Sequence, residues 1–411
     1  MDKKIKILVK PSDIYGCYLH RFLVPYTYIK NNYGDLFEID IKHEFPRDIP
    51  LDQFLSQYDI LHFHKQMDNN CEIINMAKFL GLTVIMDIDD MWDLGNDHPM
   101  SITARQQKWH EPVINHIKLA DYVTTTTEIF KKEISKFNKN VFVHPNAIDP
   151  NYPAFQLKGT TSDKLRFGII CGSSHLKDIE LMDGMTKQLS KETLDKMQFV
   201  LCGFDTNGTR TIMHQDTGKI ERRPILPQES VWYDYEKIIT DNYKIVSPQH
   251  KDFLEKFIKN TEYPNISESY RRCWTKDINS YYTHYDNIDV LLVPLKENRF
   301  NSCKSDLKVA EAGFAHKAII ASNDPPYTIP LNSMIEKGGK INENGNALLI
   351  DSSKNHKLWA KYITKLVEDR EMVKKLQDNL YKTANELYHI DVVCKHRVNC
   401  LLEAMKIDKT V

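Results

Sequence analysis

Asn298-Arg299-Phe300-Asn301-Ser302-Cys303-Lys304-Ser305-Asp306-Leu307-Lys308-Val309-Ala310-Glu311-Ala312-Gly313 carries the strongest local signal in this sequence. It follows a short apolar run, Val290–Val293, which ends at a proline. A continuous apolar run of that length is typical of a parallel strand that is buried on both faces. The pattern therefore predicts a strand, a loop and a helix, with Asn301 or Ser302 as the helix cap. This unit builds open α/β sheets.

Runs of the same kind recur along the whole chain. The first set lies at 5–9, 60–63, 83–86, 122–125 and 141–143, and the second at 165–170, 199–201, 289–293 and 318–321. Amphipathic stretches separate the runs, so each set predicts a doubly wound sheet. The segment 144–153 carries three prolines and two asparagines and marks a boundary. We expect one domain over 1–150 and a second over 160–385, facing a cleft.

Two parts of the chain lie outside these sheets in the prediction. Between about 204 and 268 the sequence becomes polar and irregular, which indicates a long excursion of the kind that often carries function. Towards the end, apolar residues at helical spacing predict several closing helices. The last of these, 386–411, is expected to pack back on the first domain.

Composition excludes several classes of protein. The 411 residues include 55 Lys and Arg against 56 Asp and Glu, so the net charge gives no reason to expect a nucleic-acid partner. The apolar runs are far shorter than the roughly 20 residues of a membrane helix. The N-terminus lacks the apolar stretch of a signal peptide, and the eight cysteines never form Cys-x-x-Cys. These features predict a cytoplasmic protein with reduced thiols.

Three charged residues of the opening stretch follow helical spacing. Lys304, Lys308 and Glu311 stand at i, i+4 and i+7, so one helix would present all three on one face. A helix start attracts phosphate, the two cations would stabilise a leaving diphosphate, and the carboxylate would accept hydrogen bonds from ribose hydroxyls. The alternative is a solvated face with a weak Lys308–Glu311 pair.

The residues 304–313, followed by Ala318-Ile319-Ile320-Ala321-Ser322, resemble the nucleotide-binding segment of family-four-type retaining glycosyltransferases, which have the GT-B fold. In that family two glutamates separated by seven residues flank the donor. Glu311 matches the second glutamate, and Cys303 stands where the first is expected. The resemblance implies that Glu311, Lys308 and Ser302 bind a nucleotide-sugar donor, and that Lys304 acts in catalysis.

The second domain opens with a strand that runs into Gly172-Ser173-Ser174-His175, followed by Leu176 and Lys177. Small residues in such a loop let the backbone approach phosphate. The resemblance places a diphosphate-gripping arginine and lysine here. Lys177 fits the lysine, Ser173 stands near the arginine position, and His175 is expected to compensate in part. An ordinary surface loop is the alternative.

Candidates in the first domain are Gly16 and Arg21 after the first strand, and the cluster Asp87-Ile88-Asp89-Asp90 with His98 beyond it. By the resemblance, Gly16 and Arg21 lie near acceptor or phosphate, although Arg21 fits a plain surface cation equally well. The aspartates could bind a metal, position an acceptor or form a capped turn. We assign Asp89 and His98 to the reacting centre and expect no metal.

The resulting prediction is a metal-independent, retaining glycosyltransferase that needs no cofactor and moves a hexosyl group from a nucleotide-diphosphate sugar to a glycan or lipid-linked acceptor. The resemblance suggests bacterial surface-polysaccharide assembly and a peripheral place at the inner face of the membrane. Three alternatives stay open: a nucleotide-sugar epimerase, a non-catalytic sugar-binding protein and an inactive GT-B partner subunit.

Overall fold

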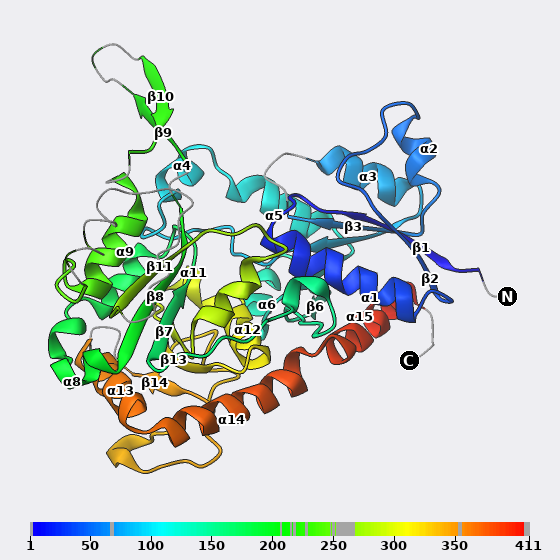
Figure 1. Cartoon of the computed structure of the whole chain (residues 1–411). Coiled ribbons are helices and arrows are strands. Elements are labelled where there is room, and N and C mark those ends of the chain that lie inside the picture. The colour runs from blue at the N-terminus through cyan, green and yellow to red at the C-terminus, as the bar shows by residue number, and fades with distance from the viewer. Residues whose placement is uncertain are drawn as a thin grey trace.

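The computed structural model describes residues 3–65, 70–205, 208–213, 216, 219–226, 229–246, 248, 251, 268–351 and 356–406. Figure 1 shows two α/β domains joined by a pair of long C-terminal helices. The prediction of two doubly wound sheets with closing helices is confirmed, because each domain contains a parallel sheet of six strands.

The first sheet has the order β2-β1-β3-β4-β5-β6. Its strands are β1 Ile5–Lys10, β2 Phe37–Ile41, β3 Ile60–His64, β4 Thr83–Asp87, β5 Tyr122–Thr125 and β6 Val141–Val143. The helices around it are α1 Val24–Asn32, α2 Leu51–Leu55, α3 Cys71–Phe79, α4 Ser101–Gln106, α5 His110–Leu119 and α6 Glu128–Ile134. In register, Ile7 lies between Ile39 and Ile60, and all three are buried. This burial on both faces explains the continuous apolar runs.

The second sheet has the order β11-β8-β7-β12-β13-β14. Its strands are β7 Leu165–Ile170, β8 Met197–Phe204, β11 Tyr270–Trp274, β12 Val290–Val293, β13 Ala318–Ser322 and β14 Leu348–Ile350. The chain builds outward from β7 to β11 and then returns to place β12 on the other side of β7. The strand order therefore reverses between β7 and β12, and open α/β sheets bind ligands at such a point, beyond the carboxyl ends of the strands.

The helix expected from the opening stretch is two helices. Arg299–Ser302 forms the short α11, whose N-cap Asn298 accepts a hydrogen bond from the Asn301 amide, and Leu307–Phe314 forms α12. The caps assigned to Asn301 and Ser302 are thus wrong. Lys304 lies in the turn between the helices, so it does not share a helical face with Lys308 and Glu311.

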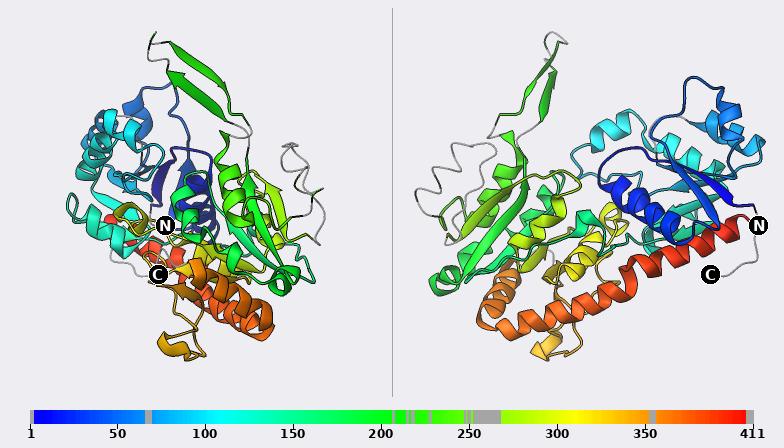
Figure 2. Two further views of the ribbon diagram at one scale, coloured as in Figure 1. Left: turned by 90° about the vertical axis from the view of Figure 1, so that its left-hand side faces the viewer. Right: turned by 45° about the vertical axis from the view of Figure 1, so that its right-hand side comes forward.

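The segment 204–268 is only partly an excursion. A hairpin of β9 Thr209–Met213 and β10 Ile220–Pro224 projects from the second domain (Figures 1 and 2). By contrast, α9 Val231–Thr240 belongs to the framework, because Tyr235 and Glu236 are fully buried. Residues 252–267 lie outside the described part of the chain.

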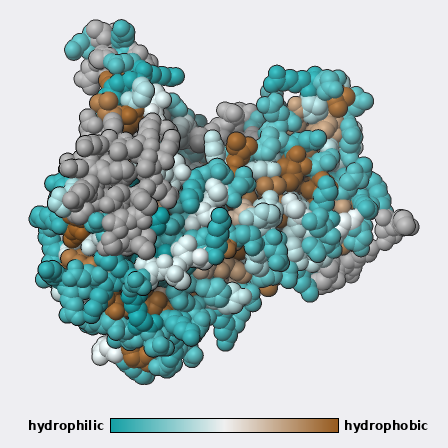
Figure 3. All heavy atoms as spheres, viewed as in Figure 1, coloured by the Kyte–Doolittle hydropathy of each residue, from teal (hydrophilic) through white to brown (hydrophobic). Residues whose placement is uncertain are grey.

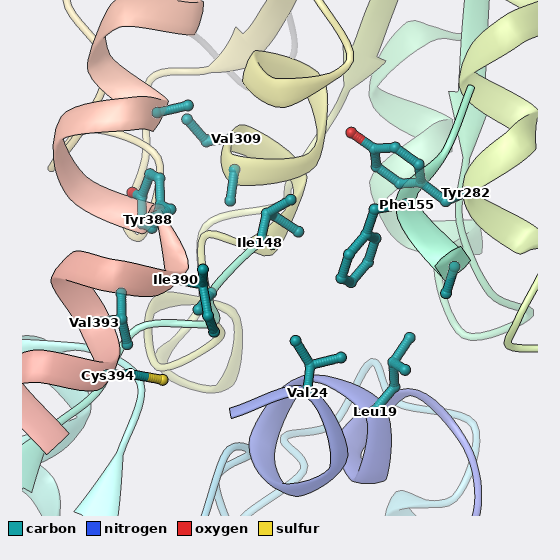
Figure 4. Packing of buried hydrophobic residues seen from close by; sticks show 14 of the residues in the cluster. Leu19, Val24, Ile148, Phe155, Tyr282, Val309, Tyr388, Ile390, Val393 and Cys394 are labelled. Carbon is teal, nitrogen blue, oxygen red and sulfur yellow. The ribbon is translucent and has the colours of Figure 1, made fainter. Parts of the chain in front are cut away.

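The two domains share one hydrophobic cluster. Figure 4 shows Leu19 and Val24 of the first domain pointing towards Ile148 and Phe155 of the connecting segment, with Tyr388 and Ile390 close by. Helix α14, Arg370–Tyr388, ends beside the second domain, and α15, Ile390–Ala404, packs along α1 (Figure 2). Backbone hydrogen bonds from Ile148 to Tyr388 (2.9 Å) and from Ile390 to Ile148 (3.0 Å) fix this crossing.

No described helix is long and apolar enough to cross a bilayer. On the face drawn in Figure 3 hydrophilic residues predominate, and the hydrophobic ones form small separate patches.

Candidate functional site

A cavity of about 350 Å³, here called the C-terminal pocket, opens at the carboxyl ends of β7, β8 and β11. Its volume lies in the range of small-molecule sites. It is lined by Ile170, Cys171, Gly172, Ser173, His175, Cys202, Gly203, Asp205, Trp232, Thr275, Lys276, Tyr281, His284 and Lys308. The predicted donor residues Gly172, Ser173, His175 and Lys308 therefore meet around one cavity.

Polar groups of different kinds face this pocket. Lys276 Nζ donates to Thr283 Oγ1 at 2.8 Å, and Lys308 lines the opposite part of the wall. Burial lowers the pKa of His284 to about 3, with Lys276 and Lys308 adding to the effect, so this imidazole is neutral. Its buried Nδ1 has no hydrogen-bond partner within the described residues. A ligand with acceptor and donor groups would complete these interactions.

Helix α9 braces the small-residue loop of the pocket. Tyr235 donates its hydroxyl proton to the carbonyl of Gly172 (3.1 Å), and the amide of His175 donates to the same hydroxyl oxygen (3.0 Å). Asp178 then ties the loop to the neighbouring segments: it accepts from His175 Nδ1 at 2.7 Å, from the Lys296 amide at 2.8 Å and from Asn301 Nδ2 at 3.1 Å. The loop is fixed before any ligand arrives.

Glu311 lies beneath the wall of the pocket. Its carboxylate is fully buried and accepts from Tyr281, from Tyr285 at 2.9 Å and from Lys308 Nζ at 3.0 Å. Burial alone would raise the pKa of Glu311, but Lys308 and His20 outweigh it and hold the pKa below its ordinary value. The Lys308–Glu311 pair considered from the sequence thus exists. Glu311 acts on the pocket through Lys308 and Tyr281, which both line it.

The two domains meet over a second, smaller cavity of about 80 Å³, here called the interdomain pocket. Lys177 and Lys304 contribute from the second domain and His98 from the loop after β4, so three predicted catalytic residues come together. The pocket lies next to the loops that follow β7 and β12, at the reversal of strand order. An ion pair of 2.9 Å between Lys296 and Asp97 bridges the domains beside it.

The three side chains differ in their environments. Lys177 Nζ lies 2.9 Å from both carboxylate oxygens of Glu180. Lys304 Nζ lies 5.3 Å from the centroid of the Phe300 ring and, within the described residues, makes no ion pair. His98 packs edge-on against the same ring, and its Nδ1 accepts from the Met100 amide at 3.1 Å. Burial, followed by the charge of Lys304, lowers the pKa of His98, which keeps its ring neutral.

Ser302 lines neither pocket. Its hydroxyl donates a hydrogen bond to the carbonyl of Asn298 at 3.0 Å. Cys303, directly after α11, is 1% exposed and belongs with Phe300 to the hydrophobic core of the first domain. The side chain at the position of the expected first glutamate therefore does not face a ligand.

Arg21 is not a cleft residue. It is 1% exposed and forms a two-pronged ion pair with the fully buried Asp87, with Nε and Nη2 at 3.0 and 2.7 Å from the carboxylate. It also donates to the carbonyl of His144. Its expected phosphate-proximal or surface role is therefore corrected: Arg21 fastens the π-helix Tyr18–Leu23, which precedes α1, to the ends of β4 and β6.

Asp89 lies beside a third cavity. This N-terminal cavity has a volume of about 720 Å³ and is lined by Lys10, Ser12, Asp13, Cys17, His43, Glu44, Phe45, Arg47, His64, Lys65, Asn70 and Ile73. Asp89 contacts His64 Nε2 at 3.1 Å and Lys65 Nζ at 3.6 Å, so the structure separates it from the Lys177, Lys304 and His98 group.

Gly16 begins the helical segment that continues through the π-helix Tyr18–Leu23 into α1. A Cβ at Gly16 would lie 4.0 Å from Ile278 Cδ1, an ordinary contact, so space alone does not require glycine. Four residues on, His20 contacts the Tyr281 hydroxyl at 2.8 Å, and Tyr281 lines the C-terminal pocket. This helical segment thus contributes Cys17 to the N-terminal cavity and, through His20, contacts the wall of the C-terminal pocket.

Cys17, His64 and Asp89 each place one ligand-type atom within 4.8 Å of the others. Asp89 is already paired with both His64 and Lys65, and the ammonium of Lys65 would oppose a cation at the same carboxylate. The carboxylates of Asp87 and Asp89 are therefore both paired with cationic or imidazole groups of the protein.

Sequence reasoning missed Trp232, Lys276, Tyr281 and His284 in the C-terminal pocket, and the organising role of Asp178. Lys276 stands two residues beyond the end of β11, so a search for polar residues at the carboxyl ends of strands could have found it. The others depend on contacts between segments far apart in the chain, for which the sequence offers no local signal.

Comparison with solved structures places this architecture among known folds. HepE of Anabaena, in complex with UDP and glucose, superposes with a TM-score of 0.58 at 11% identity, over 97% of this chain and 100% of that chain. A glycosyltransferase from Rickettsia africae matches with a TM-score of 0.57 at 11% identity, over 99% and 100%. The chain has the GT-B fold.

An alpha-glucosyltransferase, in complex with UDP and a 13-mer DNA, matches this GT-B chain with a TM-score of 0.57 at 12% identity, over 97% and 100% of the two chains. No protein-family model and no curated protein matches the sequence.

Proposed function

We propose that the chain is a glycosyltransferase that uses a nucleotide-diphosphate sugar as donor and transfers the sugar to a glycan or lipid-linked acceptor with retention of configuration. The observation that carries this proposal is the pair of lysine-lined pockets at the carboxyl ends of the second sheet, within a GT-B fold. Solved neighbours of the same fold bind UDP and UDP-glucose, which makes uridine diphosphate the first donor head group to test.

The nucleotide would occupy the C-terminal pocket. Trp232 offers an aromatic wall, the neutral His284 offers an unpaired nitrogen, and Lys276 and Lys308 offer positive charge. The diphosphate would extend along the loop of Gly172 towards the interdomain pocket. Glu311 would not touch ribose directly. It holds Lys308 and Tyr281 in place. We therefore propose a positioning role for Glu311 instead of the direct contact with ribose hydroxyls expected from the sequence.

The sugar transfer would take place in the interdomain pocket. As the bond between the sugar and the diphosphate breaks, negative charge grows on the leaving phosphate, and Lys177 and Lys304 would stabilise it. Binding across the domain interface would hold acceptor and donor in a reactive arrangement. The acceptor would attack from the face that the diphosphate leaves, without a sugar–enzyme intermediate. His98, kept neutral, would accept a hydrogen bond from the sugar or acceptor.

The N-terminal cavity is our candidate for acceptor binding. Its wall carries both signs of charge, with Lys10, Arg47 and Lys65 facing Asp13 and Glu44. Such a mixed polar wall suits a hydroxyl-rich glycan. A hydroxyl-rich ligand is also consistent with the balanced net charge, which gives no electrostatic reason for a nucleic-acid acceptor.

The direct test supplies UDP-sugars with a panel of glycan and lipid-linked acceptors and reads UDP release and the anomeric configuration of the new linkage by NMR. We expect retention. Lys177→Met and Lys304→Met should each lower kcat more than they alter acceptor KM, because the charge that they meet grows in the transition state. Lys187→Met, a surface lysine paired with Asp241, is the matched control. Inversion would refute the mechanism.

A second candidate is a non-catalytic GT-B subunit that binds the donor and supports a partner. It is favoured by one observation: Cys303 is buried in the core where the family resemblance places a donor-contacting glutamate. UDP binding without UDP release from any donor and acceptor would select this candidate. Turnover by the isolated chain would exclude it.

A further inference from the structure

A group of ligand-type side chains lies where the first sheet meets the C-terminal helix. His144 directly follows β6, and His396 and Cys400 stand four residues apart on α15. Residues at that spacing share one face of a helix, so both side chains point to the same side. One ligand-type atom from each of the three residues lies within 4.8 Å of the other two. None of the three lines the C-terminal or the interdomain pocket.

The distances suit a small tetrahedral cation. Zinc bonds of about 2.3 Å to sulfur and about 2.0–2.1 Å to nitrogen place the two ligand atoms about 3.6 Å apart. In this structure Cys400 Sγ lies 3.7 Å from His396 Nε2. The rings of His144 and His396 meet edge to face with centroids 5.2 Å apart, so a small rotation brings the third ligand within reach.

His144 is prepared to act as a ligand. The side chain is 1% exposed, and its Nδ1 is buried without a hydrogen-bond partner in the described ranges. A neutral imidazole nitrogen without a hydrogen-bond partner is free to bind a metal. The charges of two buried guanidinium groups act on His144: that of Arg397 is the stronger, and that of Arg21 is neutralised by Asp87.

Cys400 would change its protonation state on binding. Without metal, the Cys400 thiol lies 3.7 Å from His396 Nε2, at the distance of a weak hydrogen bond. A divalent cation would displace the thiol proton to solvent and take the thiolate. The exposed side of His396 leaves the fourth position open to water.

We propose that His144, His396 and Cys400 form a binding site for a zinc-type divalent cation that fastens α15 to the end of β6. The ligand set is two imidazoles, one thiolate and one water. The site is independent of the donor pockets, and its part is to hold the C-terminal helix on the first domain. A cation here would stabilise the folded chain by mass action without entering sugar transfer.

The test uses cobalt as a spectroscopic substitute on metal-stripped full-length protein. Wild-type protein should bind one Co²⁺ with a thiolate-to-cobalt charge-transfer band, and Cys400→Ser should lose that band. Cys394→Ala is the matched control: Cys394 lies on the same helix but points into the hydrophobic cluster (Figure 4), so its loss should leave the band unchanged. Cys17→Ser should also keep the band.

Two results would overturn the proposal. One is a band that survives Cys400→Ser or disappears with Cys17→Ser, which would place the metal at the other three-residue group. The other is an unchanged Tm when Zn²⁺ is added to wild-type protein. We expect Zn²⁺ to raise the Tm of wild type but not of His396→Gln, an exposed substitution that leaves the core intact. Nucleotide binding without metal should be equal in both, which separates this test from the proposed enzyme activity.

Discussion

Asp306→Asn should make the protein more stable at pH 8 and leave its stability at pH 4 nearly unchanged. Asp306 stands at the start of α12 and is 6% exposed. Its Oδ2 accepts a hydrogen bond of 2.5 Å from Tyr388, the last residue of α14, where the chain turns into α15. Its Oδ1 is buried and, among the described residues, has no partner.

Burial is the main cause of the effect. It raises the pKa of Asp306 from 3.8 to about 6, although the Tyr388 hydroxyl opposes the rise. A carboxyl whose pKa is raised on folding contributes stability below its unfolded pKa and loses that contribution as pH rises through the folded value. At 1.36 kcal/mol for each unit of pKa, the whole loss amounts to about 3 kcal/mol, of which about 2.5 kcal/mol falls between pH 4 and pH 8. Asparagine is neutral, still accepts from Tyr388, and removes this loss.

Urea unfolding of wild type and Asp306→Asn at pH 4 and pH 8 measures the difference directly. We expect the variant to gain up to about 3 kcal/mol at pH 8. Tyr388→Phe gives the opposite control: it removes the hydroxyl that favours the carboxylate, so stability should fall more steeply with pH than in wild type. A variant Asp306→Asn that is no more stable than wild type at pH 8 would refute the reasoning.

Three further outcomes are expected. Glu236→Gln should cost about 3–5 kcal/mol of unfolding free energy, because it removes the carboxylate charge that pairs with the fully buried Arg272 guanidinium. Urea unfolding measures this cost, and an unchanged midpoint would contradict the prediction. UDP affinity measured by calorimetry should be the same with a chelator as with Mg²⁺, because lysines supply the positive charge that a metal would otherwise provide. If UDP binding required Mg²⁺, Asp89 would again be a candidate metal ligand. Lys308→Met should weaken UDP binding and also lower the Tm, because it removes the ion-pair partner of the buried Glu311. A loss of UDP affinity without a change in Tm would show that the Lys308–Glu311 pair does not stabilise the fold.

The sequence predicted the architecture well because parallel strands buried on both faces leave a local signature. Val290–Val293 is a run of apolar residues in the sequence and a fully buried strand in the structure. The helix after it was predicted too long. Asp306 stands at the start of α12, and its side chain accepts a hydrogen bond from Tyr388, 82 residues further along the chain. The spacing of residues within the local sequence cannot reveal such a contact. Aspartate and serine also compete with helical hydrogen bonds, which fits a break at 303–306.

The candidate site was predicted in part for the same reason. Lys177 and Lys304 follow strand ends, and the carboxyl ends of parallel strands meet at one edge, which explains why both lysines line the interdomain pocket. Arg21 was misplaced because its partner Asp87 lies 66 residues away. Glu311 carried a family pattern, but its burial depends on Tyr281 and Tyr285 from a different segment. The sequence shows which residues are charged, but it does not show which residues they contact in the fold.

The central claim is that the C-terminal pocket binds the nucleotide, and calorimetric titration of UDP into a pocket-blocking variant tests it most directly. Gly172 is exposed, and a Cβ there would meet nothing within 4 Å, so Gly172→Phe can place a ring at the mouth without disturbing the fold. Lys191→Phe adds a similar ring on the exposed surface of α8, Lys191–Asp195, as the control. We predict that wild type and Lys191→Phe bind UDP equally and that Gly172→Phe binds none. Unchanged UDP affinity in Gly172→Phe would contradict the account.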